Sequence, residues 1–213
     1  REKGVGHMLE TVPFPTGTVE VTLDGAGIPS YEIRQGVAWD NIPFTPQIEE
    51  LARHTRAACF GSLAQRSPVS HRTIGRFLET MPDGEGQYKV FDINLRQHFY
   101  TQQVVEESLR KCNILKINDE ELAVVGSMFG LEGMQPGEQC RTLLDRYGLR
   151  IVILTCGAAG SSVFAPDTRS YIPTPRVEVA DTVGAGDSFT ASFLAALLSG
   201  LGIGEAHRLA VDV

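Results

Sequence analysis

Short apolar runs alternate with amphipathic segments over most of this chain. Apolar runs with the length of strands lie at residues 57–61, 88–94, 114–117, 151–155, 161–164 and 170–172. Apolar residues recur at helical spacing at residues 47–55, 70–78, 101–111, 119–128, 136–147 and 188–198. Strands that alternate with helices in units of this size need crossover connections, which place neighbouring strands parallel. The sequence therefore predicts an α/β fold with a largely parallel central sheet flanked by helices.

The chain before these units has a different pattern. Residues 17–23 alternate apolar and polar side chains, and so do residues 30–34. The glycine-rich stretch at 24–27 separates them, and two alternating runs joined in this way are typical of a β-hairpin. No repeat or linker divides the rest. We therefore expect a single domain over residues 1–213, with a small hairpin at 18–34 within it.

Polar residues follow several of the predicted strands. Asp92 and Asn94 end one strand, Asn118 ends the next, and Thr155 and Gly157 end a third. Ligands of open α/β sheets bind at the carboxyl ends of the strands. Because these residues belong to one edge of the predicted sheet, we expect the active site there.

Charge and composition exclude several classes of protein. The 213 residues carry a formal net charge of −7 and no basic stripe, which argues against nucleic-acid binding. No apolar run approaches the ~18 residues that would cross a membrane. The four cysteines are far apart and have neither zinc-site nor C-x-x-C spacing. We interpret them as reduced residues of a cytoplasmic protein.

The most specific pattern is D-T-V-G-A-G-D at residues 181–187, directly before the last long helix. Gly184, Ala185 and Gly186 place small side chains and unpaired N–H groups at the amino end of that helix, and such an end binds anions. A carboxylate beside a bound phosphate is repulsive unless it has a chemical role. Asp187 is therefore a candidate proton acceptor for an attacking hydroxyl. The alternative is that Asp187 only caps the helix.

Neither a dinucleotide fingerprint nor a Walker A loop fits this stretch, because the glycine spacing differs and no Gly-Lys-Ser/Thr follows. Residues 181–187 instead resemble the signature of the ribokinase-like (PfkB) carbohydrate kinases, D-T-x-G-A-G-D before a small, apolar helix. The resemblance implies that ATP and Mg²⁺ are the cofactors and that Asp187 is the catalytic base. It also implies that Thr182 lies in the nucleotide site and that Gly184, Ala185 and Gly186 stabilise charge on the phosphoryl oxygens.

Two further stretches are similar to motifs of this family. Residues 118–121 resemble its N-x-x-E motif, which implies that Asn118 lies in the nucleotide site and that Glu121 acts on magnesium through water. The alternative is a helix N-cap with a capping box, and both roles can coexist. Residues 155–160 resemble its T-x-G-x-x-G turn, which implies that Thr155, Gly157 and Gly160 lie along the ATP. The alternative there is a simple glycine turn after a strand.

Residues 92–96 resemble the D-x-N-x-R segment of the fructokinase-like and ketodeoxygluconate-kinase-like branch. That resemblance implies that Asp92 and Arg96 lie in the substrate site. The alternative for Arg96 is a surface ion pair with a carboxylate. The hairpin at 18–34 resembles the family's lid, which closes over the sugar and excludes water. The same hairpin implies a possible homodimer formed through the lid.

Together these motifs predict an ATP-dependent sugar kinase that phosphorylates a primary hydroxyl, with fructose as the first choice of substrate. The alternatives within the fold are ribose, ketodeoxygluconate or a nucleoside. An alternative of another class is a non-catalytic sensor of sugars or nucleotides. The family's Gly-Gly-x-x-x-Asn sugar motif does not precede residue 15, and its last helix and strand do not follow residue 213. We therefore expect segments of the domain to be missing at both ends.

Overall fold

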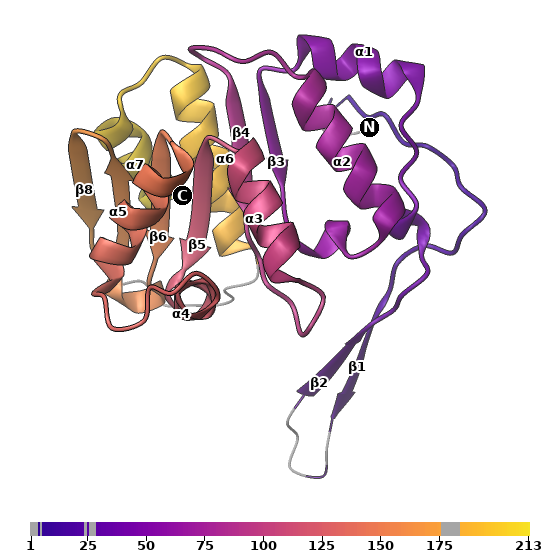
Figure 1. The fold of residues 1–213 in the computed structure, drawn as a ribbon, viewed down its shortest axis with the longest axis horizontal. Helices are drawn as coiled ribbons and strands as arrows, with labels where there is room; N and C mark the ends of the chain where they lie inside the picture. Colours follow the sequence, from indigo (N-terminus) through magenta and orange to yellow (C-terminus); the bar gives the residue numbers. More distant parts are fainter. Residues whose placement is uncertain (1–3, 5, 24, 26–28, 176–183) are drawn as a thin grey trace.

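The computed structural model describes residues 4, 6–23, 25, 29–175 and 184–213. The central sheet has six strands in sequential spatial order (Figure 1). They are β3 (Ala57–Phe60), β4 (Tyr88–Asp92), β5 (Ile114–Asn118), β6 (Ile151–Thr155), β7 (Ser161–Ala165) and β8 (Thr168–Ile172). The first four strands are parallel, whereas β7 and β8 run antiparallel to their neighbours. The predicted α/β fold with a largely parallel sheet is confirmed.

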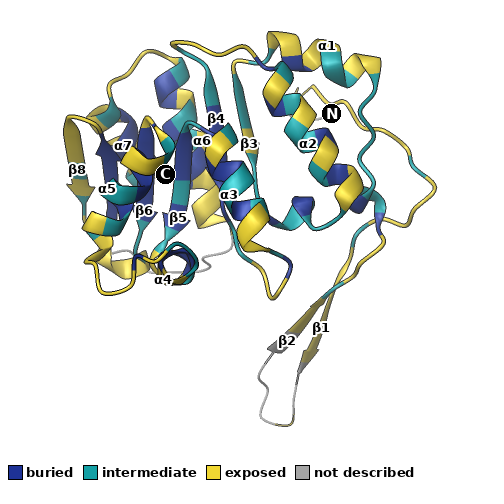
Figure 2. Cartoon of the chain, in the orientation of Figure 1, coloured by how far each residue is buried: buried dark blue, intermediate teal, exposed yellow. Residues whose placement is uncertain are grey.

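Helices cover both faces of this sheet (Figures 1 and 2). One face carries α3 (Gln102–Lys111), α4 (Asp119–Met128) and α5 (Pro136–Tyr147), and the other carries α6 (Ala185–Leu198) and α7 (Ile203–Asp212). The remaining long helices, α1 (Pro46–His54) and α2 (Pro68–Thr80), lie beside β3. No helix in the described part of the chain is long and apolar enough to cross a membrane.

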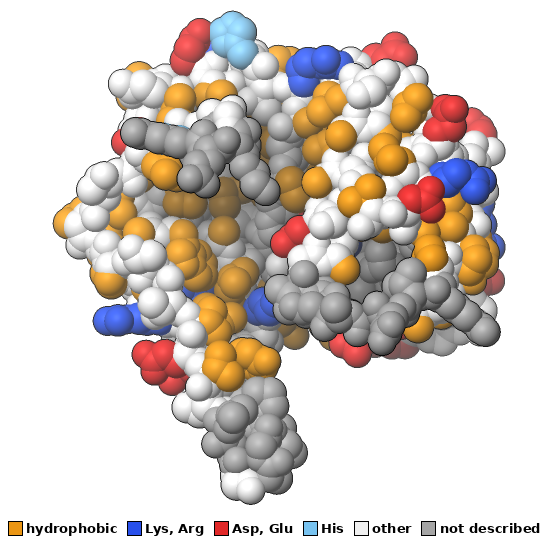
Figure 3. Space-filling model, turned by 180° about the vertical axis from the view of Figure 1, so that it is seen from behind, with side chains coloured by type: hydrophobic (Ala, Val, Ile, Leu, Met, Phe, Trp, Pro, Cys, Tyr) orange, Lys and Arg blue, Asp and Glu red, His pale blue; other side chains and the backbone are white. Residues whose placement is uncertain are grey.

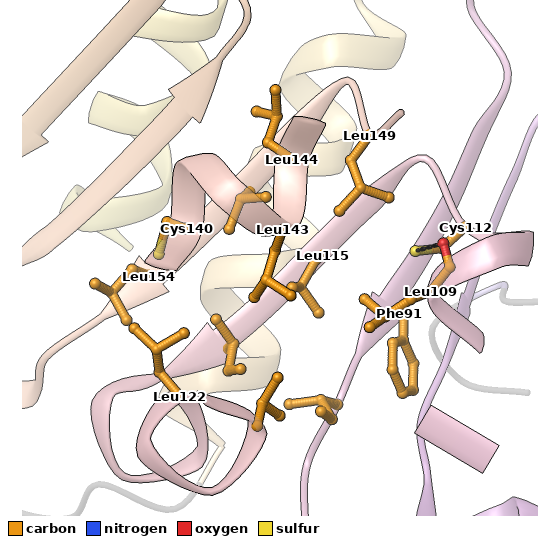
Figure 4. Close-up of a cluster of buried hydrophobic side chains, with 14 of the residues drawn as sticks. Phe91, Leu109, Cys112, Leu115, Leu122, Cys140, Leu143, Leu144, Leu149 and Leu154 are labelled. Atoms are coloured by element: carbon orange, nitrogen blue, oxygen red, sulfur yellow. Dashed lines mark hydrogen bonds between the residues drawn. The ribbon is translucent and has the colours of Figure 1, made fainter. Parts of the chain in front are cut away.

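The central strands divide their side chains between two cores. Phe91 of β4 and Leu115 of β5 point toward α3, α4 and α5, as Figure 4 shows. Their neighbours Val90 and Ile114 belong to the second core, beneath α6 and α7. This alternation follows from the two-residue period of a strand. Because both faces of the sheet are buried, these strands appear in the sequence as continuous apolar runs.

The edge strand β3 is less covered than its neighbours. None of its four residues is fully buried, whereas four of the five residues of β4 are. Figure 3 shows the face that carries α6 and α7 hollowed beside these helices, with hydrophobic side chains along the hollow. The sheet is therefore covered completely only at its centre.

Capping residues set the helix boundaries. The side chains of Thr45, Ser67 and Thr101 accept hydrogen bonds from the first turns of α1, α2 and α3. Proline occupies the first turn of α1 and of α2, where its missing N–H needs no partner. For this reason α2 begins two residues before the start that apolar spacing predicts. Gly148, in the left-handed conformation at φ 61°, ends α5.

The predicted hairpin is confirmed and projects away from the sheet (Figure 1). Its strands β1 (Val19–Leu23) and β2 (Pro29–Ile33) pair antiparallel, with Val19 opposite Ile33. Most of the predicted turn at 24–27 lies outside the described residues. Val19, Val21 and Tyr31 each expose more than half of their surface.

A buried arginine anchors the base of the hairpin. Arg66 donates to both carboxylate oxygens of Asp40, from Nε at 2.8 Å and from Nη2 at 2.9 Å, and also donates to the Arg34 carbonyl just after β2. Its guanidinium lies between the rings of Trp39 and Phe99, at 4.0 and 4.6 Å from their centroids. Burial raises the pKa of Asp40, but hydrogen bonds from Arg66 and the backbone outweigh burial and hold that pKa below its ordinary value.

The Arg66→Met variant of the full-length protein will therefore lose about 3–5 kcal/mol of unfolding free energy, because it leaves the Asp40 carboxylate buried without its partner. Chemical denaturation measures this loss. Arg76→Met is the control, since Arg76 stacks on Phe44 at 4.0 Å and contributes ~0.5–1 kcal/mol. Equal losses in the two variants would contradict this account of the hairpin base.

A second buried polar contact fixes α7 on the sheet. His207 is fully buried, and its two ring nitrogens lie 2.8 Å from Ser161 Oγ and 2.8 Å from Ser170 Oγ. A neutral imidazole can donate to one hydroxyl and accept from the other. Burial lowers the pKa of His207 from 6.5 to about 4.

Because the unfolded chain binds a proton near pH 6.5 and the folded chain only near pH 4, this residue stabilises the fold fully above pH 6.5. The contribution is lost as the pH falls from 6.5 toward 4. We expect the melting temperature of the full-length protein to fall over this window, and to fall less in His207→Gln. His54→Gln, at an exposed position on α1, should keep the wild-type slope. A slope unchanged in His207→Gln would refute the assignment.

Candidate active site

The carboxyl ends of the central strands meet at one edge of the sheet, as the sequence predicts. Asp92 is the last residue of β4 and pairs with Lys116 of β5. Asn118 is the last residue of β5 and pairs with Thr155, the last residue of β6. Three of the predicted site segments therefore start from adjacent strands.

The amino end of α6 reaches the same edge. Gly184, its N-cap, has φ 84° and ψ −5°, a left-handed conformation that favours glycine. The first hydrogen bond of the helix runs from Ser188 N to the Gly184 carbonyl at 2.8 Å. The amides of Ala185, Gly186 and Asp187 precede this bond and have no partner within the helix. Asp187 is exposed in the first turn. Thr182 lies outside the described residues.

Asp92 connects this turn to the sheet. Its side chain is 12% exposed, and both of its oxygens lie 3.1 Å from the Lys116 ammonium. The hydroxyl of Thr190, on the next turn of α6, is 3.0 Å from Asp92 Oδ2 and 3.0 Å from the Gly186 carbonyl. A carboxylate on β4 and an ammonium on β5 thus hold the start of α6. The role of Asp92 in substrate binding stays a prediction.

The thiol of Cys59 on β3 lies in the same electrostatic environment. Burial of the thiol, together with the negative charges of Asp92 and Asp187, raises the pKa of Cys59 to about 11, although the positive charge of Lys116 opposes this rise. The ends of β3, β4, β5 and the start of α6 are therefore neighbours. Sequence reasoning missed Cys59, Lys116 and Thr190. Of these three, only Lys116 could have been noticed in the sequence, because it is a charged residue inside an otherwise apolar strand.

Asn118 and Glu121 form a capping box at the start of α4. Asn118 Oδ1 accepts from Glu121 N at 2.8 Å, and Glu121 Oε2 accepts from Asn118 N at 3.0 Å. The capping-box reading of this motif is confirmed. Glu121 Oε1 also accepts from Leu95 N at 2.9 Å, which ties α4 to the segment after β4. The action of Glu121 on a metal stays a prediction.

The stretch after β6 forms the glycine turn that the sequence predicts. Thr155 ends the strand, and the short 3₁₀ helix η3 (Gly157–Ala159) follows. Gly157 and Gly160 have φ of 50° and 109°. A Cβ atom on Gly160 would lie 2.5 Å from the Ile172 carbonyl oxygen, so only glycine fits there. Nucleotide contacts of these residues stay predictions.

Arg96 lies in a loop with an unusual backbone. Asn94 and Gln97, which flank it, both have left-handed conformations, at φ 44° and 49°. Arg96 Nη1 donates to the Leu95 carbonyl at 3.0 Å, and within the described part of the chain Arg96 makes no ion pair. Gln97 donates to the Tyr31 carbonyl at 2.6 Å, which links this loop to the hairpin. Arg96 thus lies between β4 and the hairpin.

The chain is similar to known kinases. It is 31% identical to a fructokinase of Rhizobium leguminosarum bv. trifolii over 160 residues, which cover 72% of this chain and 46% of that protein. It is 30% identical to an aminoimidazole riboside kinase of Salmonella typhimurium over 114 residues, which cover 51% of this chain and 34% of that protein. The chain spans about half the length, or less, of these relatives.

A solved structure shares the fold. A sugar kinase of Pyrococcus horikoshii, PH1459, solved in complex with ATP, superposes with a TM-score of 0.75 over 96% of this chain and 65% of that chain, at 23% identity. This likeness confirms the predicted fold. The model of the pfkB carbohydrate kinase family matches residues 69–213, which is more than half of the chain and includes β4 to α7. The chain belongs to the pfkB family of carbohydrate kinases.

Proposed function

We propose that this chain belongs to an ATP-dependent sugar kinase, which transfers the γ-phosphate of ATP to a primary hydroxyl of a small carbohydrate. The observation that carries the proposal is the start of α6, where three amides without a hydrogen-bond partner among the described residues and the exposed carboxylate of Asp187 lie together at the carboxyl edge of the sheet. Membership in the family supports the same reaction.

Asp187 is the proposed catalytic base. Its carboxylate is exposed, whereas Asp92, on the neighbouring strand end, is buried and already accepts from Lys116 and Thr190. An exposed carboxylate can approach an attacking hydroxyl and take its proton. The amides of Ala185, Gly186 and Asp187 then stabilise negative charge on the phosphoryl oxygens, without reorganisation during the reaction.

The start of α6 suits the phosphates of ATP, and Glu121 is the residue proposed to act on magnesium. The left-handed turn at Gly184 and the amides after it, which have no partner within the helix, suit a phosphate group. Within the described residues, no three His, Cys, Asp or Glu side chains gather where they could hold a metal ion. Mg²⁺ commonly takes one or two carboxylates together with waters and substrate phosphates. Glu121 is the proposed contributor, through water, and bound Mg²⁺ would neutralise charge on the phosphates.

Fructose is the proposed substrate. The resemblance of residues 92–96 to the fructokinase-like branch and the 31% identity to a fructokinase support this choice. The similar aminoimidazole riboside kinase favours a ribose-containing substrate as the second candidate. We further propose that residues 1–213 form one domain and that the hairpin at 18–34 closes over the sugar. The exposed Val19, Val21 and Tyr31 make it suitable for pairing with a second copy.

The Asp187→Asn variant of the full-length protein will turn over ~10²–10⁴-fold more slowly, because the amide cannot accept the proton of the hydroxyl. The measurement is ADP release with Mg-ATP and fructose, ribose, ketodeoxygluconate or adenosine, each supplied separately. Asp145→Asn, an exposed change on α5, is the control and should keep the wild-type rate. A wild-type protein that binds ATP but phosphorylates none of the four would favour the sensor alternative. Near-normal turnover in Asp187→Asn would remove Asp187 from the mechanism.

The Glu121→Gln variant separates capping from magnesium binding. Both Glu121 oxygens accept backbone N–H groups, from Asn118 and Leu95, and an amide can accept only one of them, so we expect a loss of about 1–3 kcal/mol of unfolding free energy. Glu138→Gln is a matched control, because Glu138 Oε2 accepts from Gln135 N at 2.9 Å in the capping box of α5. Only Glu121→Gln should also raise the Mg²⁺ concentration needed for half-maximal turnover. An unchanged Mg²⁺ requirement would leave Glu121 with the structural role alone.

A further inference from the structure

Lys116 occupies an unusual position for a charged residue. It is the third residue of β5, inside an otherwise apolar run, and its side chain is 12% exposed. The ammonium lies 3.1 Å from each carboxylate oxygen of Asp92. An ammonium has three N–H donors. Among the described residues, Lys116 Nζ donates to Asp92 Oδ1, and Asp92 Oδ2 completes the ion pair, so within this part of the chain at least one donor is left for another acceptor.

The same ammonium contacts the first turn of α6. A Cβ atom placed on Gly186 would lie 3.0 Å from Lys116 Nζ, which is closer than an ordinary side-chain contact allows. The absence of a side chain at Gly186 therefore leaves the space that the ammonium fills. A positive charge is held against the turn in which the amides of Ala185, Gly186 and Asp187 have no helical partner.

Stability alone does not explain this buried pair. Removing an ammonium and a carboxylate from water costs several kcal/mol, and an apolar pair of the same volume is often as stable. A second buried lysine gives a useful contrast. Lys89, near the amino end of β4, is 8% exposed, but it pairs at 2.6 Å with Asp83, which is 86% exposed. The side chains of Lys116 and Asp92 are instead both only 12% exposed, directly beside the amino end of a helix.

We propose that Lys116 is a catalytic residue whose ammonium binds the transferred phosphoryl group at the amino end of α6, beside the amides of residues 185–187. This inference rests on the proposed kinase function. Negative charge spreads over the phosphoryl oxygens during transfer, and a fixed cation stabilises it. Asp92 holds the ammonium in place, and Thr190 holds Asp92, so the cation is positioned before the substrate binds. No bond to Lys116 forms or breaks.

The test uses the full-length protein and compares Lys116→Met with the double variant Lys116→Met/Asp92→Asn. The single variant leaves a buried carboxylate without its partner, so it should lose stability as well as activity. The double variant is neutral at both positions and should recover most of the lost melting temperature. If Lys116 binds the phosphoryl group, kcat of the double variant stays reduced by ~10²–10³-fold, the cost of one lost donor at such a site. A change in the KM for the sugar would report on Asp92, the predicted substrate-binding residue of the pair, whereas the loss of kcat reports on the phosphoryl contact of Lys116.

A matched control makes the comparison specific. Lys89→Met/Asp83→Asn neutralises the other buried lysine and its partner, away from the carboxyl edge of the sheet. This variant should keep the wild-type kcat. Recovery of both stability and kcat in Lys116→Met/Asp92→Asn would overturn the proposal, because Lys116 would then serve only as the counter-ion of Asp92.

Binding measurements test the contact between Lys116 and the phosphoryl group independently of turnover. Calorimetry compares the affinity for ADP with Mg²⁺ to the affinity for ADP with Mg²⁺ and aluminium fluoride, which mimics the transferred phosphoryl group. The wild-type protein should bind the second combination more tightly, and Lys116→Met/Asp92→Asn should lose at least tenfold of that gain. If aluminium fluoride tightens ADP binding equally in the double variant, or does not tighten it in the wild type, Lys116 does not bind the phosphoryl group. Failure of turnover on every sugar would count against the proposed function, whereas this binding result concerns Lys116 alone.

Discussion

A parallel sheet must be covered on both faces, because crossover helices leave no face for water and the strands are apolar on both sides. Here β4, β5 and β6 send alternate side chains into two separate cores, beneath α3 to α5 on one face and beneath α6 and α7 on the other. With both faces closed, the edge at the carboxyl ends of the strands remains for chemistry. The position of every candidate site residue depends on this coverage.

The coverage also explains why a polar network lies at the start of α6. The helix packs on the second core through Phe189 and Phe193, and its amino end reaches the polar edge of the sheet. There the apolar contacts give way to Asp92, Lys116 and Thr190, which fix the orientation of the first turn. Apolar packing holds the helix against the sheet, and three polar side chains set where its amides and Asp187 lie.

Much of this arrangement could be predicted from local sequence. Continuous apolar runs indicated the buried strands, alternation indicated the hairpin, and residues 118–121 indicated a capping box that the structure contains. The contacts between distant residues could not be predicted. Asp92 and Thr190 are 98 residues apart, and Glu121 reaches Leu95 across 26 residues. Such contacts depend on how helices dock, and no local pattern of residue types records that geometry. The antiparallel direction of β7 and β8 was not predicted, although the connections at 156–160 and 166–167 are too short for the crossover that parallel strands need.

The sequential order of the strands has a consequence for how the chain folds. Each strand from β4 to β8 pairs with the strand before it in the sequence, so no pairing in this sheet has to wait for a later strand. A chain emerging from the ribosome can add strands one at a time to a growing sheet. The helix α6 is different, because it returns from the end of this series to cover strands made much earlier. The turn with Asp187 therefore reaches its position only after strands β3 to β8 exist, and a chain that ends before α6 has no assembled candidate site.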